Sequence, residues 1–431
     1  MRPRTGLVVL VAFVLATAVA CSSARQQPAA APVQSEQHPP GHTGPAAQAP
    51  AAGAASTPEA LLAGFEQLLG RHTLLVVRLT RTDVFGAPDV RRATDAAVQA
   101  NTAELTGLVA SAYGAAEGER FGQLWRGHLD HLTDYAEAAG KGAGPAKDTA
   151  RAALRADSAA YGAWLAQARK GRVAAADAER AMQHHLDELL RQTDAYAVRD
   201  YAQAYRVERE AYEHMFQAGA SMAKGSLDPK AAARLDAAPA KLRSAFAMLL
   251  GEHMELVIDA QRATFAGTSE FQAAAAQVNE NSKALVEAMG AIVGPKKAAE
   301  FEGGWAEHVE ELMAYTAAVA DRNQAGEEDA QEELSEYAAD LAAYFRDIVA
   351  DRLALGTLLG VLTLHDRHLT DHVDAYAARD FTTATRVELE GYQHIHGVAD
   401  TLVSAIQRTL QPGLPVGGSQ TGGGGTATSR R

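Results

Sequence analysis

The chain has 431 residues, of which 47% are hydrophobic and 22% are charged, and its formal net charge is −13. This acidic balance, without any dense run of Lys and Arg, argues against binding to a phosphate backbone, so no nucleic-acid partner is expected. Cys21 is the single cysteine, which excludes a disulfide within the chain and a metal site built from thiolates.

Residues 1–20 have the pattern of an export signal peptide. Arg2 and Arg4 precede an apolar run of about fifteen residues, shorter than the roughly twenty that a membrane-spanning helix needs. The run ends in the letters AVAC, at Cys21, which resembles the lipobox of bacterial lipoproteins except that its first Ala stands where Leu is usual. The resemblance implies that Cys21 becomes the lipidated first residue of the mature chain. The alternative is an ordinary secretory signal with an incidental cysteine.

Residues 21–56 are rich in Ala, Pro and Gln and nearly lack large apolar side chains. Such a segment cannot bury a core, so we predict a disordered tether between the lipid and the folded part. Residues 411–431 are predicted to form a flexible tail for the same reason. These features predict an exported protein whose lipid anchors it to the outer face of the cytoplasmic membrane, which makes the membrane its expected partner.

Nearly all of the sequence between these segments favours helix, with strong helix formers, few β-branched runs and Pro confined to breaks. Glycine and proline breaks divide residues 57–224 into six predicted helices, and Asp200 is the predicted N-cap of the sixth. The predicted helices cover residues 58–82, 89–113, 118–140, 147–169, 174–197 and 200–223.

The second half of the chain repeats the first. The segment Asp194–His214 recurs as Asp374–His394, an offset of 180 residues, with thirteen identical positions. A match of this quality indicates an internal duplication. The predicted fold class is therefore all-α, with two tandem helical bundles of about six helices each, over residues 57–224 and 230–410. The helices of the second bundle are predicted over residues 231–264, 269–293, 295–321, 327–350, 353–378 and 380–409.

Four histidines are retained in each copy, and each lies on the apolar stripe near the middle of its predicted helix. In a bundle of antiparallel helices the middles share one level, so we predict that the four imidazoles of each copy approach one another. An Asn, a Tyr and a Glu of each copy are predicted to surround them. The predicted metal ligands are His72, His128, His185, His214, His253, His308, His365 and His394. The predicted surrounding residues are Asn101, Tyr196, Glu210, Asn281, Tyr376 and Glu390.

Several imidazoles buried at one level need partners for their ring nitrogens. A transition metal satisfies several of them at once, and imidazole suits copper and zinc, so the metal-binding hypothesis names copper or zinc as the cofactor. The alternative is a non-catalytic scaffold or interaction module whose histidines form structural hydrogen-bond networks. An oxidoreductase working at the metal is a weaker third hypothesis, because no substrate pocket can be recognised. The sequence has no haem-attachment or nucleotide-binding motif and no catalytic motif, which favours a protein that is not an enzyme.

The duplicated region, about residues 58–410, resembles a group of exported tandem-repeat helical proteins from Gram-positive bacteria. The shared features are a His early in the first helix, a Trp-x-x-His motif (WRGH and WAEH in this sequence) and a closing helix with Tyr-x-His before small residues. The resemblance implies an exported helical-bundle protein, and it implies no particular activity.

Overall fold

The computed structural model describes residues 57–266, 269–350 and 352–410. The predicted signal peptide, the predicted lipidation site Cys21, the predicted tether and the predicted C-terminal tail lie outside these residues. The described residues form thirteen helices and no strand, which confirms the all-α prediction. The helices are α1 (Pro58–Phe85), α2 (Pro88–Tyr113), α3 (Ala115–Gly140), α4 (Gly144–Ala168), α5 (Ala175–Ala197), α6 (Tyr201–Ser226), α7 (Pro229–Arg234), α8 (Ala238–Ala266), α9 (Glu270–Val293), α10 (Pro295–Asp321), α11 (Gln324–Ile348), α12 (Leu355–Ala377) and α13 (Phe381–Leu410).

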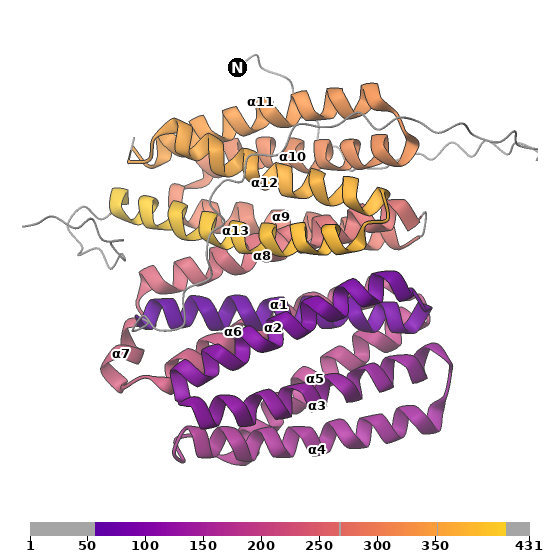
Figure 1. The fold of residues 1–431 in the computed structure, drawn as a ribbon. Helices are drawn as coiled ribbons and strands as arrows, with labels where there is room; N and C mark the ends of the chain where they lie inside the picture. Colours follow the sequence, from indigo (N-terminus) through magenta and orange to yellow (C-terminus); the bar gives the residue numbers. More distant parts are fainter. Residues whose placement is uncertain (1–56, 267–268, 351, 411–431) are drawn as a thin grey trace, which may run out of the picture. The chain divides into compact units, whose positions relative to one another are not determined.

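The helices of the two copies correspond one to one along the sequence, with α7 as the connection between them (Figure 1). The bounds of α4 and α5 recur in α11 and α12 at the 180-residue offset of the sequence repeat. The α1 and α8 helices align at an offset of 181, because the second copy has one residue fewer between His253 and Asn281 than the first copy has between His72 and Asn101. As predicted, Asp200 caps α6, and its side chain accepts a hydrogen bond from the Gln203 N–H.

The start of the second copy differs from the prediction. One helix was expected over residues 231–264, but the structure has the short helix α7, a turn, and then α8. Asp228 caps α7 through hydrogen bonds from the N–H groups of Lys230 and Ala231. Pro239 lies in the first turn of α8, where its missing N–H costs no helical hydrogen bond, so the chain begins a new helix there.

Three helices of each copy form the inside of its bundle. In the first copy α1, α3 and α5 contact one another, while α2, α4 and α6 lie between them around the outside. The α8, α10 and α12 helices have the same arrangement in the second copy. Every residue of α1 from Leu69 to Thr82 is buried, as is every residue of α8 from Leu249 to Gln261. A helix that is buried on all sides has neighbours all round it.

The two copies pack against each other mainly through α1, α2 and α6 of the first and α8, α9 and α13 of the second. One pair of equivalent residues meets in this interface. The hydroxyl oxygens of Tyr212 and Tyr392, which are 180 positions apart in the sequence, lie 3.0 Å apart. Contact between equivalent residues is the property of a two-fold interface, here formed within one chain.

Buried charges also lie between the two copies. The guanidinium of Arg78 contacts Glu388, lies 3.0 Å from Glu255 and 3.4 Å from Asp259, and so joins α1 to both α8 and α13. Arg81 lies 2.6 Å from Glu208 and 2.9 Å from Asp259. All of these side chains are at most 9% exposed, so their charges stabilise one another with little help from water.

Candidate metal centre

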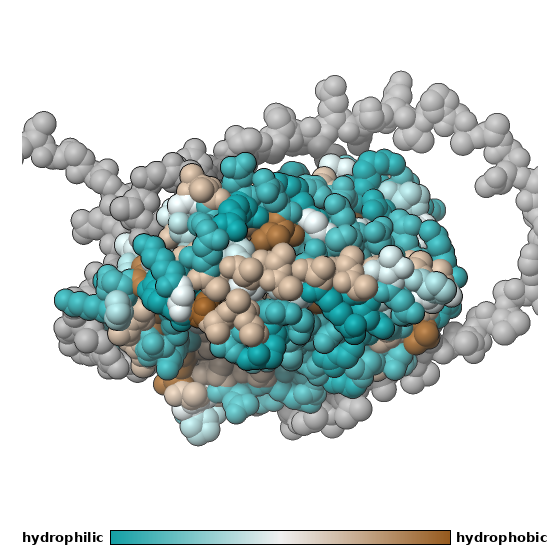
Figure 2. Space-filling view, turned by 90° about the horizontal axis from the view of Figure 1, so that it is seen from below, coloured by the Kyte–Doolittle hydropathy of each residue, from teal (hydrophilic) through white to brown (hydrophobic). Residues whose placement is uncertain are grey.

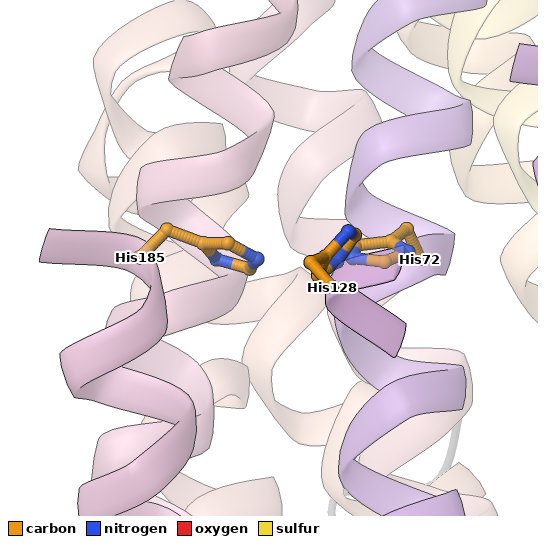
Figure 3. A group of neighbouring side chains, drawn as sticks. All are labelled: His72, His128 and His185. Carbon is orange, nitrogen blue, oxygen red and sulfur yellow. The ribbon is translucent and has the colours of Figure 1, made fainter. Parts of the chain in front are cut away.

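In the first copy, three of the predicted ligands meet at the centre of the bundle (Figure 3). His72 comes from α1, His128 from α3 and His185 from α5. The ring centroid of His72 lies 5.4 Å from that of His128 and 5.7 Å from that of His185. Each ring offers a nitrogen that lies within 4.8 Å of the others. The three side chains are at most 1% exposed, so this histidine triad is closed to solvent.

The second copy has the same triad. His253 on α8, His308 on α10 and His365 on α12 have ring centroids 5.6–5.8 Å apart, and their side chains are at most 4% exposed. The ligand nitrogens again lie within 4.8 Å of one another. The duplication has therefore kept two buried histidine triads, one inside each bundle.

A tryptophan packs on each triad from one turn earlier on the third helix of its copy. The ring centroid of Trp125 lies 4.6 Å from that of His72, and Trp305 lies at the same distance from His253. Both indoles are buried, at 2% and 5% exposure. They close the apolar wall around the imidazoles, which explains the Trp-x-x-His pattern by packing.

Burial changes the protonation of the triad histidines. Desolvation lowers the pKa of His128 and of His253 to about 3, because a charged imidazole loses its hydration inside the bundle. The pKa values of His72, His185, His308 and His365 are well below their usual range for the same reason, with a further lowering from the neighbouring rings. At neutral pH all six rings are therefore neutral, the form that binds metals.

The ring nitrogens of the triads lack hydrogen-bond partners among the described protein atoms. This holds for both nitrogens of five rings and for Nε2 of His72, eleven buried nitrogens in total. A buried polar group left without a partner costs about 1–3 kcal/mol. Buried polar groups are nearly always satisfied, so the nitrogens of these two equivalent clusters are available to a metal ion or to water.

The two triads differ in one neighbour. In the second copy Asp366 Oδ1 lies 3.5 Å from His308 Nδ1, and burial raises the pKa of this carboxyl to about 8. The equivalent residue in the first copy is Leu186. The ring of Tyr337 also stacks on His308 in the second copy, with centroids 4.7 Å apart. The second triad thus has a carboxyl group within reach that the first one lacks.

Asn101 and Asn281 face inward as predicted, and they support the triads indirectly. The side-chain amide of Asn101 donates to the Leu68 carbonyl at 3.1 Å, and Asn281 donates to the Leu249 carbonyl at 3.0 Å. Each carbonyl belongs to the residue one helical turn before the first histidine of its triad, and so accepts that histidine's backbone N–H in an α-helix. The two asparagines therefore fix the inner helix at the level of the triad.

The fourth histidine of each copy does not join its triad. His214 lies on α6, which is outside the three inner helices, and its Nδ1 contacts Glu188 at 2.9 Å. His394 lies on α13, and its Nε2 is 2.8 Å from the Val361 carbonyl oxygen. The expectation of four converging imidazoles is thus corrected to three. The α6 and α13 helices lie on the outside of their bundles and contact both their own bundle and the other copy, so their histidines do not reach the triads.

Four other predicted neighbours lie away from the triads. Glu210 and Glu390 are exposed, with side chains 48% and 52% accessible, and they contact Arg191 and Arg386. The Tyr196 hydroxyl donates to Glu270 of the other copy, and Tyr376 packs on Phe265 and Phe381. Each tyrosine is eleven residues from the triad histidine of its helix, which corresponds to roughly 16 Å of helix.

Sequence reasoning also missed the buried charges between the copies. Glu208 and Glu388, two residues before the predicted glutamates, are 4% and 1% exposed and bind arginines of α1 and α8. A signal was present in α1, where Arg78 directly follows the four apolar residues LLVV, which cover every side of the helix. A helix that is apolar all round is buried all round, so its arginines must be paired inside the protein.

Comparison with protein families, curated proteins and solved structures gave no match for this chain. Within the described residues, no helix combines the length and the apolar character that crossing a bilayer requires. The surface seen from below in Figure 2 is mainly hydrophilic, with a narrow band of mildly hydrophobic residues and scattered strongly hydrophobic ones.

Proposed function

We propose that each bundle binds one copper or zinc ion through its buried histidine triad. The observation that supports this most is the set of eleven buried imidazole nitrogens without a protein hydrogen-bond partner. Three bonds of about 2.0–2.1 Å to one ion place the ligand nitrogens roughly 3.3–3.6 Å apart. The nitrogens lie within 4.8 Å of one another, so the rings would approach one another by up to roughly an ångström when an ion is held.

The chemistry of the triads suits such an ion. Imidazole is a ligand for both copper and zinc, and three neutral rings leave an ion with a further coordination position. Because the pKa of His128 and His253 is about 3, protons compete for these rings only in strong acid. Metal retention is thus expected to extend well below the pH of about 6 at which an ordinary imidazole becomes protonated.

The alternative function is a scaffold whose histidines form a structural hydrogen-bond network. In such a network each ring would exchange hydrogen bonds with protein groups, as Asn101 and Tyr212 do. The triad rings pack mainly against one another and the tryptophans, and eleven of their twelve nitrogens have no hydrogen-bond partner among the described protein groups. This contrast favours metal binding over a structural network.

The test is metal content of the full chain after removal of metal and dialysis against copper or zinc. The wild-type protein is expected to hold an ion in each triad, and the double variant His128→Leu, His308→Leu is expected to lose both of these ions. A His214→Ala, His394→Ala variant is expected to keep them, since neither residue belongs to a triad. Circular dichroism checks that each variant remains helical.

The stability of the metal-free protein separates the two functions. Leu is similar to His in volume, and His128→Leu removes two buried nitrogens that have no partner. If the triad is kept for a metal, this variant is as stable as the wild type or more stable. Loss of stability together with unchanged metal content would instead support the structural network.

The proposal includes export and a lipid on Cys21, which would place the metal sites at the outer face of the cytoplasmic membrane. There the protein would sequester or buffer the ion before it reaches the membrane. The N-terminal sequence supports this placement through its basic start, its short apolar run and its AVAC letters. Release of a Cys21→Ser variant from the membrane fraction tests it.

A further inference from the structure

A separate cluster of ligand-type side chains lies on the first copy, outside the buried triad. His184 and Glu188 are four residues apart on α5, so they share one face of that helix. His214 reaches the same place from α6. The two Nδ1 atoms lie 3.1 Å apart, and each is close to a carboxylate oxygen of Glu188, at 3.2 Å for His184 and 2.9 Å for His214.

These three distances match those of a metal site. Neighbouring ligands of a tetrahedral zinc ion with bonds of about 2.0–2.1 Å are about 3.3 Å apart. The carboxylate of Glu188 is only 4% exposed, whereas the His184 side chain is 62% exposed and that of His214 is 27% exposed. An ion held here would be coordinated by Glu188 on its buried side, and water could reach it on the exposed side, next to His184.

The second copy shows which residues the cluster needs. At the equivalent positions it has Leu364, His368 and His394. The rings of His368 and His394 still lie near each other, with centroids 5.3 Å apart. The carboxylate is gone, however, and His394 contacts a backbone carbonyl instead. The complete set of two histidines and one carboxylate is thus found in the first copy alone among the described residues.

We infer that His184, Glu188 and His214 form a third metal site, which faces solvent and binds a divalent ion such as zinc. Its mixed ligand set differs from the all-imidazole triads, because a carboxylate favours a divalent ion. Three protein ligands leave a fourth position for water or an exogenous ligand. Since its residues are distinct from those of the triads, the site does not depend on the proposed function of the triads.

Without a metal, the same residues would form a hydrogen-bonded group in which Glu188 accepts from both histidines. The experiment must therefore count ions. Zinc binding is measured by equilibrium dialysis of the full chain, first in the wild type and then in the His128→Leu, His308→Leu background that disables the triads. In that background one zinc ion per chain is expected to remain, and adding His184→Leu is expected to remove it.

Leu is the residue that the second copy has at this position, and His184 is largely exposed, so the substitution leaves the fold intact. The matched control is His131→Leu, which alters another partly exposed histidine with a carboxylate partner, Asp157 at 2.7 Å. Cobalt bound in the same background should give the absorption of a tetrahedral site, and His214→Leu should abolish it. Zinc content that is unchanged by His184→Leu, or no zinc in the triad-deficient background, would overturn the inference. Failure of the triads alone would leave this one ion in place.

Discussion

His308 and His128 occupy equivalent positions, but only His308 has a carboxyl group beside it. A carboxylate that accepts the free ring N–H of a metal-bound histidine orients the ring and makes it a stronger ligand, and its removal typically lowers metal affinity about 10–100-fold. We predict that Asp366→Leu, which introduces the residue found in the first copy, lowers the affinity of the second triad by about this factor.

Competition with a chelator of known affinity measures this effect. The wild-type titration is expected to have two steps for the triads, and the Asp366→Leu titration is expected to bring them together. The first triad serves as an internal control, since its affinity should not change. An unaltered second triad would mean that Asp366, 3.5 Å from His308, does not act on the metal.

The triad histidines also predict how the stability of the metal-free protein depends on pH. Their pKa values are lowered in the folded chain, to about 3 for His128 and His253, and are near 6.5 in an unfolded chain. Between these values the unfolded chain binds more protons, so acid favours unfolding. The stability that these groups contribute is complete above pH 6.5 and falls by up to about 1.4 kcal/mol per pH unit for each histidine as the pH falls towards 3.

Denaturant unfolding at a series of pH values between 4 and 7 checks this prediction. The His128→Leu, His308→Leu variant should take up fewer protons on unfolding than the wild type, with the difference approaching two protons near pH 4, and its stability should therefore depend less steeply on pH. Equal slopes for the two proteins would show that these histidines are protonated to the same extent in the folded and unfolded chains.

At the level of single helices, α6 packs unusually close to α1 at Gly219. A Cβ atom placed on Gly219 would lie 2.7 Å from the Cα and N atoms of Glu66, which are backbone atoms and cannot rotate away. We predict that Gly219→Ala destabilises the protein by about 1–3 kcal/mol, because the two helices must separate.

Gly127→Ala is the matched control. Gly127 lies inside α3, and no atom lies within 4 Å of the position that the methyl group of an alanine would take. Alanine there is therefore expected to stabilise the helix by roughly 0.5–1 kcal/mol. Thermal unfolding followed by circular dichroism measures both variants. A Gly219→Ala protein as stable as the Gly127→Ala protein would contradict the close approach of the two helices.

The α6 helix also shows where prediction from the sequence stops. Periodicity identified its helical character and its cap correctly, and the triad histidines of α1, α3 and α5 were found by their place on apolar stripes. A stripe cannot reveal whether the surface that covers it belongs to the same bundle or to the other copy. On α6, Tyr212 is buried against Tyr392 of the other copy and Glu208 is buried in its ion pair with Arg81. With these residues facing the interface, Glu210 points outward and His214 lies beside α5.

For the whole molecule, the buried charges around Arg78 hold the two copies together. Removing one partner of a buried ion pair leaves the others uncompensated, which typically costs about 3–5 kcal/mol. We predict a loss of this size for Arg78→Leu, because Glu255 and Asp259 would be left in the interface without this partner. Denaturant unfolding of the metal-free full chain measures it.

Arg386→Leu is the control for charge removal. Arg386 is 58% exposed and pairs with Glu390 one turn along α13, so its loss should change the stability by no more than about 0.5 kcal/mol. Similar small effects for the two variants would show that the interface does not depend on its ion pairs.

Arg78 and Asp259 are equivalent residues of the two copies, and they face each other with opposite charges 3.4 Å apart. In a dimer of two identical chains, one residue type would have to face itself at this place, and two arginines or two aspartates would repel. Joining the copies in one chain removed that requirement, since each half always meets the other and never a twin. Partner choice is therefore encoded at this position, where each half is complementary to the other half and not to itself.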